Sequence, residues 1–226
     1  KDIDFILFGD SHAEMYAQAF LNYSKNYNKN FCFVSSLVTC NFLKNDKDKS
    51  FIKTDCKKRK EILINFFSKE KFSNLIISHA WFTLQQRDLH EIKIRYENFY
   101  NEMFGDQQKN IVFLLSVPEF SNGISMESCS SFPKYIVKKR NCYSALKNTS
   151  KIKQNDNINK LIQSEIQNSL KGNSFFLNPY DYLCDSIKCK QVIDEHDVYI
   201  DQDHLSLHSS NLLVKFWKNK LINLMK

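Results

Sequence analysis

Short apolar runs alternate with longer amphipathic stretches along this chain. Five strand-like runs occupy residues 4–8, 31–36, 74–78, 110–116 and 174–177. Because these runs are nearly continuous in apolar residues, they are typical of strands that are buried on both faces of a sheet. Between and after the runs, the spacing of apolar positions predicts helices at 13–27, 57–69, 89–104, 157–170 and 206–225.

This alternation of strands and helices predicts the α/β class. We expect a three-layer α/β/α sandwich around about five parallel strands, flavodoxin-like in strand order, with helices on both faces. The length of 226 residues and the apolar fraction of 42% suit a single domain over residues 1–226. Two polar stretches, residues 37–55 and 118–155, are expected to be long irregular loops that leave the carboxyl edge of the sheet.

Charge adds little to this picture. The net charge is +7, and the densest basic clusters are residues 57–60 and 138–140. These basic residues do not interleave with aromatic residues as a nucleic-acid groove requires, so we expect a solvated surface and no nucleic-acid partner.

The cysteines predict an oxidising compartment. Their spacing brackets loops and suggests three disulfides, Cys40–Cys56, Cys129–Cys142 and Cys184–Cys189, with Cys32 left as a free thiol in a strand. The alternative is a metal site built from Cys184, Cys189 and His196, but these residues lack the paired C-x-x-C spacing of zinc sites.

The candidate chemistry lies at the two ends of the chain. Gly9-Asp10-Ser11-His12 follows the first apolar run, so a buried strand delivers Ser11 to the carboxyl edge of the sheet. Near the other end, Asp201 and His204 stand three residues apart just before the last predicted helix. A serine hydroxyl needs an imidazole to accept its proton and a carboxylate to orient that imidazole, so Ser11, His204 and Asp201 are the predicted catalytic residues.

Plainer interpretations exist for each of these residues. Ser11 also suits a helix cap, and Asp203 is a second candidate for the carboxylate. The gap of three residues favours Asp201, because it lets the carboxylate turn back onto the ring of His204. We expect the ring of His12 to point away from the site, and we assign no role to the remaining histidines apart from His79.

The two motifs resemble those of a known family. Phe8-Gly9-Asp10-Ser11-His12-Ala13 is similar to the first block of SGNH (GDSL-type) esterases and acyltransferases, and Asp201-Gln202-Asp203-His204 is similar to their D-x-x-H block. Val117-Pro118-Glu119, Tyr182-Leu183-Cys184 with Cys189, and residues 199–206 resemble the SGNH domains fused behind acyltransferase-three membrane proteins. Such domains help to O-acetylate cell-surface polysaccharides.

The chain departs from the family where the oxyanion hole is completed. Many members have a glycine after the second strand and an asparagine after the third, but no glycine lies between Gly9 and Gly105. The third strand ends instead in Ser78-His79-Ala80-Trp81, an aromatic ending similar to that of the acyltransferase-fused subgroup. We place Ser36 and His79 near the oxyanion hole, with a core or loop role as the alternative for His79. Trp81 is part of the resemblance, and we expect it either to stack on a sugar ring of the substrate or to be a core aromatic.

The resemblance implies acyl transfer, with an acetyl group as the expected cargo, to hydroxyls of a surface glycan. The alternatives are a free-standing carbohydrate O-acetylesterase and a non-catalytic sugar-binding domain. We expect no bound cofactor, because a membrane-embedded acyltransferase partner or an upstream domain would supply the acetyl group. We also expect no metal, because the cysteines suit disulfides better than a zinc site. The chain would then be a domain excised from a longer protein, tethered to the inner membrane on its periplasmic or cell-surface side.

Overall fold

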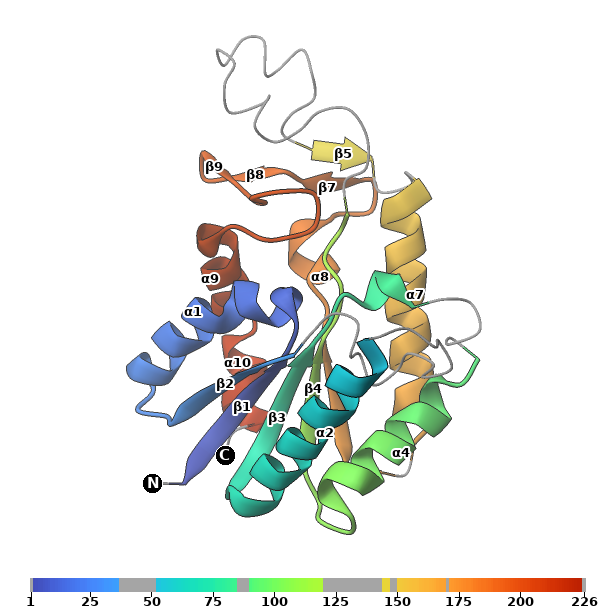
Figure 1. Ribbon diagram of the computed structural model, residues 1–226. Helices are drawn as coiled ribbons and strands as arrows, with labels where there is room; N and C mark the ends of the chain where they lie inside the picture. Colours follow the sequence, from blue (N-terminus) through green and yellow to red (C-terminus); the bar gives the residue numbers. More distant parts are fainter. Residues whose placement is uncertain are drawn as a thin grey trace.

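A parallel five-stranded sheet forms the centre of the computed structural model, which describes residues 2–36, 52–84, 90–119, 144–146, 150–169 and 171–224 (Figure 1). The strands are β1 (Ile3–Gly9), β2 (Phe31–Ser35), β3 (Phe72–Ser78), β4 (Asn110–Leu114) and β6 (Asn173–Leu177). Their order in the sheet is β2-β1-β3-β4-β6, and each neighbouring pair is parallel. This order confirms the predicted flavodoxin-like α/β fold.

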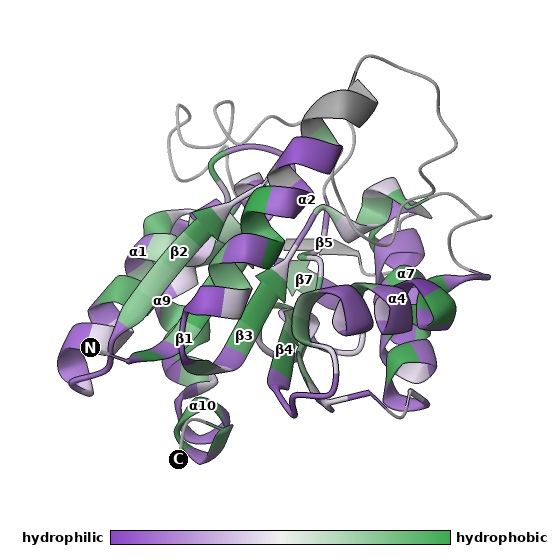
Figure 2. Cartoon of the chain, turned by 60° about the horizontal axis from the view of Figure 1, so that its bottom comes forward, coloured by the Kyte–Doolittle hydropathy of each residue, from purple (hydrophilic) through white to green (hydrophobic). Residues whose placement is uncertain are grey.

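Helices cover both faces of the sheet, and the strands divide their side chains between two cores. In β1, Phe5 and Leu7 pack into the core under α1 (Ser11–Asn26), α9 (Leu207–Phe216) and α10 (Lys218–Leu224), whereas Ile6 and Phe8 pack into the opposite core. That second core lies under α2 (Ile52–Lys69), α4 (Ile92–Phe104) and α7 (Ser150–Gln167). Figure 2 shows the result as apolar strands between helices with one hydrophobic and one hydrophilic side. Because successive side chains of a strand point to opposite faces, a strand that contributes to both cores needs a nearly continuous apolar run.

Helix α7 begins at Ser150, seven residues before the start at 157 that the apolar spacing predicts. Its first turns carry polar residues that are buried rather than exposed. Asn159 is fully buried, and its side chain accepts a hydrogen bond from Ser116 N and donates one to Ser116 O, each at 2.9 Å. Asn155 and Asp156, which precede the predicted start, are buried as well, and Asn155 donates to Glu119. Polar residues of this kind resemble loop residues in the sequence, which explains the late prediction.

The predicted last helix over 206–225 is instead two helices. Helix α9 ends at Phe216, Trp217 caps it, and α10 continues from Lys218. The two helices still share one apolar face, since Leu213, Trp217 and Leu221 are all fully buried in the same core. Phe216, in contrast, is 47% exposed.

Smaller elements lie over the carboxyl end of the sheet, opposite the end where the two chain termini lie (Figure 1). They are η2 (Trp81–Thr83), α8 (Tyr180–Leu183), β5 (Ser144–Leu146), β7 (Lys188–Lys190), β8 (Val192–Ile193) and β9 (His196–Asp197). The pairs β5–β7 and β8–β9 are antiparallel. This end of the sheet is where open α/β folds bind their ligands.

The cysteines follow the sequence prediction wherever the structure describes them. Cys184 and Cys189 form a disulfide that joins α8 to β7, and Cys32 is a free thiol in β2 that is half-buried rather than enclosed in the core. The disulfide removes the alternative of a metal site on these two cysteines. Cys56 is also disulfide-bonded. Cys40, Cys129 and Cys142 lie outside the described residues, so the other two predicted pairings stay predictions.

Candidate active site

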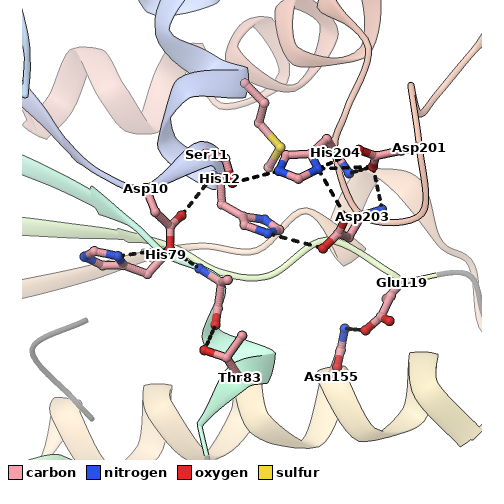
Figure 3. A network of polar contacts seen from close by, with 12 residues as sticks. Asp10, Ser11, His12, His79, Thr83, Glu119, Asn155, Asp201, Asp203 and His204 are labelled. Atoms are coloured by element: carbon pink, nitrogen blue, oxygen red, sulfur yellow. Dashed lines mark hydrogen bonds and ion pairs between the residues drawn. The ribbon is translucent and has the colours of Figure 1, made fainter. Parts of the chain in front are cut away.

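Ser11 is the first residue of α1 and stands exposed at the carboxyl end of β1 (Figure 3). The turn before it depends on Gly9, which has φ +153°. A β-carbon on Gly9 would lie 1.7 Å from the carbonyl oxygen of Ser78. Glycine is therefore required for β1 to lie this close to the end of β3 and still deliver the serine.

Asp10 fixes the start of α1 to the neighbouring strand. Its carboxylate caps the helix by accepting a hydrogen bond from His12 N at 2.9 Å, and it accepts a second from Ala80 N at 3.0 Å. His79 Nδ1 lies 3.3 Å from the same carboxylate. Burial by itself would raise the pKa of Asp10, but the hydrogen bonds from His79 and the backbone outweigh it and hold the pKa below its ordinary value. An ionised, buried carboxylate thus anchors the residue before Ser11.

His204 meets Ser11 from the other end of the chain. Its Nε2 lies 2.8 Å from Ser11 Oγ, and its Nδ1 lies 2.8 Å from Asp201 Oδ2. The three side chains form a hydrogen-bonded chain in the order serine, imidazole, carboxylate (Figure 3). Residues separated by about 190 positions in the sequence are thereby brought together, as the two motifs predicted.

Hydrogen bonds to the carboxylate of Asp201 fix the conformation of the loop between β9 and α9. Asp201 Oδ1 accepts backbone hydrogen bonds from Asp203 N at 3.0 Å and His204 N at 2.7 Å, which is an Asx turn. Ile200 N donates to His204 O at 2.9 Å and closes the loop. Leu205 N lies 3.3 Å from the sulfur of Met15 on α1, which joins the loop to the helix of the serine. The spacing of three residues therefore folds the carboxylate back onto the imidazole.

A second carboxylate contacts His204. Asp203 Oδ1 lies 3.1 Å from His204 Nδ1, and Asp203 Oδ2 lies 3.5 Å from Nε2 of His12. The rings of His12 and His204 stack with centroids 4.7 Å apart and planes at 29°. The expectation that His12 points away from the site is therefore wrong: the first turn of the helix brings its ring beneath His204.

The two carboxylates change the basicity of His204. The hydrogen bond to Asp203 is the largest influence, partial burial opposes it, and the negative charges of Asp203 and Asp201 add to it, so the pKa of His204 is raised to about 9. Burial by itself would raise the pKa of Asp203, but its contacts with His12 and then His204 outweigh it and lower the pKa well below its ordinary range. The two carboxylates therefore make His204 a stronger base than a free imidazole.

The other three predicted site residues lie beneath or beside this chain of contacts. Ser36 follows β2, donates its N–H to Gly9 O at 2.6 Å, and is nearly buried; its hydroxyl has no hydrogen-bond partner within the described ranges. His79 and Trp81 are fully buried, where His79 contacts Asp10 and the indole of Trp81 donates to Leu114 O at 2.8 Å. Ser36 and His79 contact the turn that precedes Ser11, through Gly9 and Asp10. A direct contact with substrate stays a prediction for all three.

His12, Asp203 and His204 also have the chemistry of metal ligands, and their ligand atoms lie within 4.8 Å of one another. A metal ion binds in the plane of an imidazole ring, along the nitrogen lone pair. Because the two rings are stacked and nearly parallel, they do not direct their nitrogens to one point between them. The arrangement fits hydrogen bonding to Asp203 better than metal coordination.

Glu119 is a further buried carboxylate at this end of the sheet, in the segment after β4 (Figure 3). Lys151 Nζ lies 2.5 Å from one of its oxygens, and Asn155 Nδ2 donates to the other at 3.4 Å. Both partners come from the first turns of α7. The charge of Glu119 is therefore already paired within the protein.

Known proteins match this chain in family and in fold. The family described as "SGNH domain (fused to AT3 domains)" matches residues 1–219. A solved structure, the periplasmic domain of a lipopolysaccharide acetyltransferase from Salmonella ser. Paratyphi A, matches with a TM-score of 0.68 at 15% sequence identity, over 98% of this chain and 84% of the other. No curated protein matches the sequence. Within the residues that the structure describes, no helix has the length and apolar character needed to cross a membrane.

Proposed function

Because the chain belongs to the family of SGNH domains that are fused to AT3 domains, we propose that it transfers an acyl group to hydroxyls of a cell-surface polysaccharide through an acyl–serine intermediate. Acetyl is the proposed cargo. The observation that carries this proposal is the hydrogen-bonded chain from Ser11 Oγ through His204 to Asp201, with contacts of 2.8 Å on each side of the imidazole. These three residues would act as a catalytic triad.

In the first step, Ser11 Oγ attacks the carbonyl carbon of the donor while His204 Nε2 takes the serine proton. The carbonyl oxygen becomes an oxyanion, and the N–H of Ser11 is a suitable donor for it because the first N–H groups of a helix have no acceptor within the helix. The tetrahedral intermediate collapses, the bond to the leaving group breaks, and His204 returns the proton to that group. Ser11 then carries the acyl group as an ester.

In the second step, an acceptor hydroxyl attacks the acyl–serine. His204 takes the proton of that hydroxyl and returns it to Ser11 Oγ as the ester bond breaks. Asp201 keeps the Nδ1–H of the imidazole directed toward itself and stabilises the positive charge that forms. If the acceptor is a sugar, the product is an acetylated glycan; if it is water, the activity is that of an esterase.

The donor and the location are part of the same proposal. A membrane-embedded acyltransferase domain would present the acetyl group, in line with the fusion that the family description states. The domain would face the periplasm or cell exterior, which the Cys184–Cys189 disulfide supports because such bonds persist in oxidising compartments. The similar Salmonella structure is itself a periplasmic domain.

The test compares the wild type with Ser11→Ala on a chromogenic acetyl ester, followed by mass spectrometry of surface glycans incubated with the donor. Loss of the nucleophile should lower kcat by at least roughly 10³-fold. Ser164→Ala is the matched control, because Ser164 is an exposed helical serine that bonds a backbone carbonyl, at 3.0 Å. Activity of Ser11→Ala close to wild type would exclude Ser11 as the nucleophile, and the absence of hydrolysis and transfer in the wild type would favour the sugar-binding alternative.

A further inference from the structure

His204 has two carboxylates at one nitrogen. Its Nδ1 lies 2.8 Å from Asp201 and 3.1 Å from Asp203, although a single N–H is available there. The two carboxylates differ in surroundings, since 51% of the Asp201 side chain is exposed but only 22% of that of Asp203. Water screens an exposed charge more strongly, so the charge of Asp203 acts on the imidazole at least as strongly as that of Asp201.

Asp203 is itself held by His12. The His12 side chain is 3% exposed, its backbone N–H is bound to Asp10, and its Nε2 lies 3.5 Å from Asp203. Its other ring nitrogen has no hydrogen-bond partner in the described part of the chain. The ring is further enclosed by an edge contact with Phe82 at 5.4 Å. The carboxylate of Asp203 is thus held from the interior of the protein as well as from its own loop.

We propose that His12 and Asp203 are positioning residues, forming a second imidazole–carboxylate pair that shares the Nδ1–H of His204 with Asp201 and holds its ring over the first turn of α1. This inference rests on the proposed function. With this arrangement, either carboxylate can orient the ring of His204. When one carboxylate is lost, the other keeps the ring nitrogen Nε2 directed at Ser11.

The pair also accounts for the raised pKa of His204, for which Asp203 is the first cause. Among the residues that the structure describes, the imidazole of His204 contacts Ser11 and His12 on α1 and Asp201 and Asp203 on its own loop. The carboxylate of Glu119 is paired with Lys151. An opposite charge at this distance moves a pKa by roughly 1 to 3 units. Removing Asp203 should therefore change the titration of His204 more than removing any exposed carboxylate.

The first experiment titrates His204 by NMR of its ring in the whole chain and also measures the pH profile of kcat/KM on the acetyl ester. Asp203→Asn should lower the pKa of His204, and the acidic limb of the profile, by at least about 1 unit. Glu14→Gln is the control, because Glu14 is an exposed carboxylate on the helix turn that carries Ser11 and His12. An unchanged pKa in Asp203→Asn, or an equal shift in Glu14→Gln, would overturn the inference.

The second experiment tests redundancy. Replacing a lone triad carboxylate by an amide costs roughly 10⁴-fold in kcat. With Asp203 in place, Asp201→Asn should lose only about 10- to 100-fold, whereas Asp201→Asn with Asp203→Asn should approach that full loss of roughly 10⁴-fold. A loss of that size in Asp201→Asn alone would show that Asp203 does not share the role.

His12 is tested in the Asp201→Asn background with two variants. His12→Phe keeps the stacked ring without its nitrogen and should remove about a further 10-fold of activity, whereas His12→Gln retains an N–H near Asp203 and should restore it. Equal activity in both variants would contradict a role for the nitrogen. Failure of the proposed function is read separately from Ser11→Ala, because the NMR titration needs no activity.

Discussion

Ser11 and His204 meet in the site, but the segments that present them are built in different ways. The residue before Ser11, Asp10, is 2% exposed and is bonded to the end of the neighbouring strand β3. The carboxylate behind His204, Asp201, is 51% exposed and is bonded to the backbone of its own loop. The nucleophile is thus fixed by the core of the sheet, and the base by a surface turn.

Substitutions on the two sides of the site should therefore differ in how they affect stability and activity. A substitution on the nucleophile side disturbs contacts between β1 and β3, so it should reduce stability as well as activity. A substitution of Asp201 on the base side changes a carboxylate that is half exposed to water, so it should reduce activity with little effect on folding.

The largest effect on stability is expected for Gly9→Ala. The new β-carbon would lie 1.7 Å from Ser78 O and 2.9 Å from the β-carbon of Ala13, so strands β1 and β3 would have to separate. With the unfavourable φ, the free energy of unfolding should fall by about 3 to 5 kcal/mol. Urea unfolding measures this change.

Gly105→Ala is the matched control for this prediction. Gly105 also has positive φ, +56°, but a β-carbon there would meet no atom within 4 Å. Its cost should be roughly 1 to 2 kcal/mol, from the backbone alone. Equal losses at both glycines would contradict the close contact of β1 with β3.

A smaller loss is expected for Asp10→Asn. The amide retains one acceptor but loses the charge that His79, Ala80 N and His12 N share, so unfolding should become about 2 kcal/mol easier at pH 7. Because the pKa of Asp10 is lower in the folded state, this stabilisation is present above its unfolded pKa near 4 and is lost as pH falls through the folded value. The wild type and the variant should therefore become equally stable in strong acid.

The control for this second prediction is Asp185→Asn. Asp185 is an exposed carboxylate that accepts two backbone hydrogen bonds at 2.7 Å, so it makes similar local contacts in water. Its loss should cost less than about 1 kcal/mol. A loss as large as that of Asp10→Asn would mean that burial does not strengthen the Asp10 contacts.

The same contrast explains what the sequence could predict. The five strands were recognisable because both of their faces are buried, and the Asp201–His204 pair because its geometry depends on a gap of three residues. The anchor of Asp10 on Ala80 and the stacking of His12 on His204 join residues that are distant in sequence, so no local pattern reveals them. The one available signal was the adjacency of His12 to Ser11 and of Asp203 to His204.

Polar residues with buried partners caused the late start predicted for α7. Its first turns were not predicted as helix because Asn155 and Asp156 read as exposed, whereas both are buried. The partner of Asn155, Glu119, follows β4 and is reached only through the fold. Hydrophobic periodicity cannot register a helix face that is satisfied by hydrogen bonds.

The smallest expected effect concerns the base side, through the pH dependence of stability. The pKa of His204 is about 9 in the folded state, against an ordinary value of 6.5. A group whose pKa is raised by folding stabilises the protein fully below its unfolded pKa, and this contribution is lost as pH rises through the folded value.

The free energy of unfolding should therefore decline between pH 6.5 and pH 9. Because water screens the partly exposed groups His204, Asp201 and Asp203, the decline should be at most about 1 kcal/mol. Urea midpoints over this range should fall in the wild type and in the control His196→Gln, and stay level in His204→Gln. A slope that persists in His204→Gln would assign the pH dependence to groups outside the site.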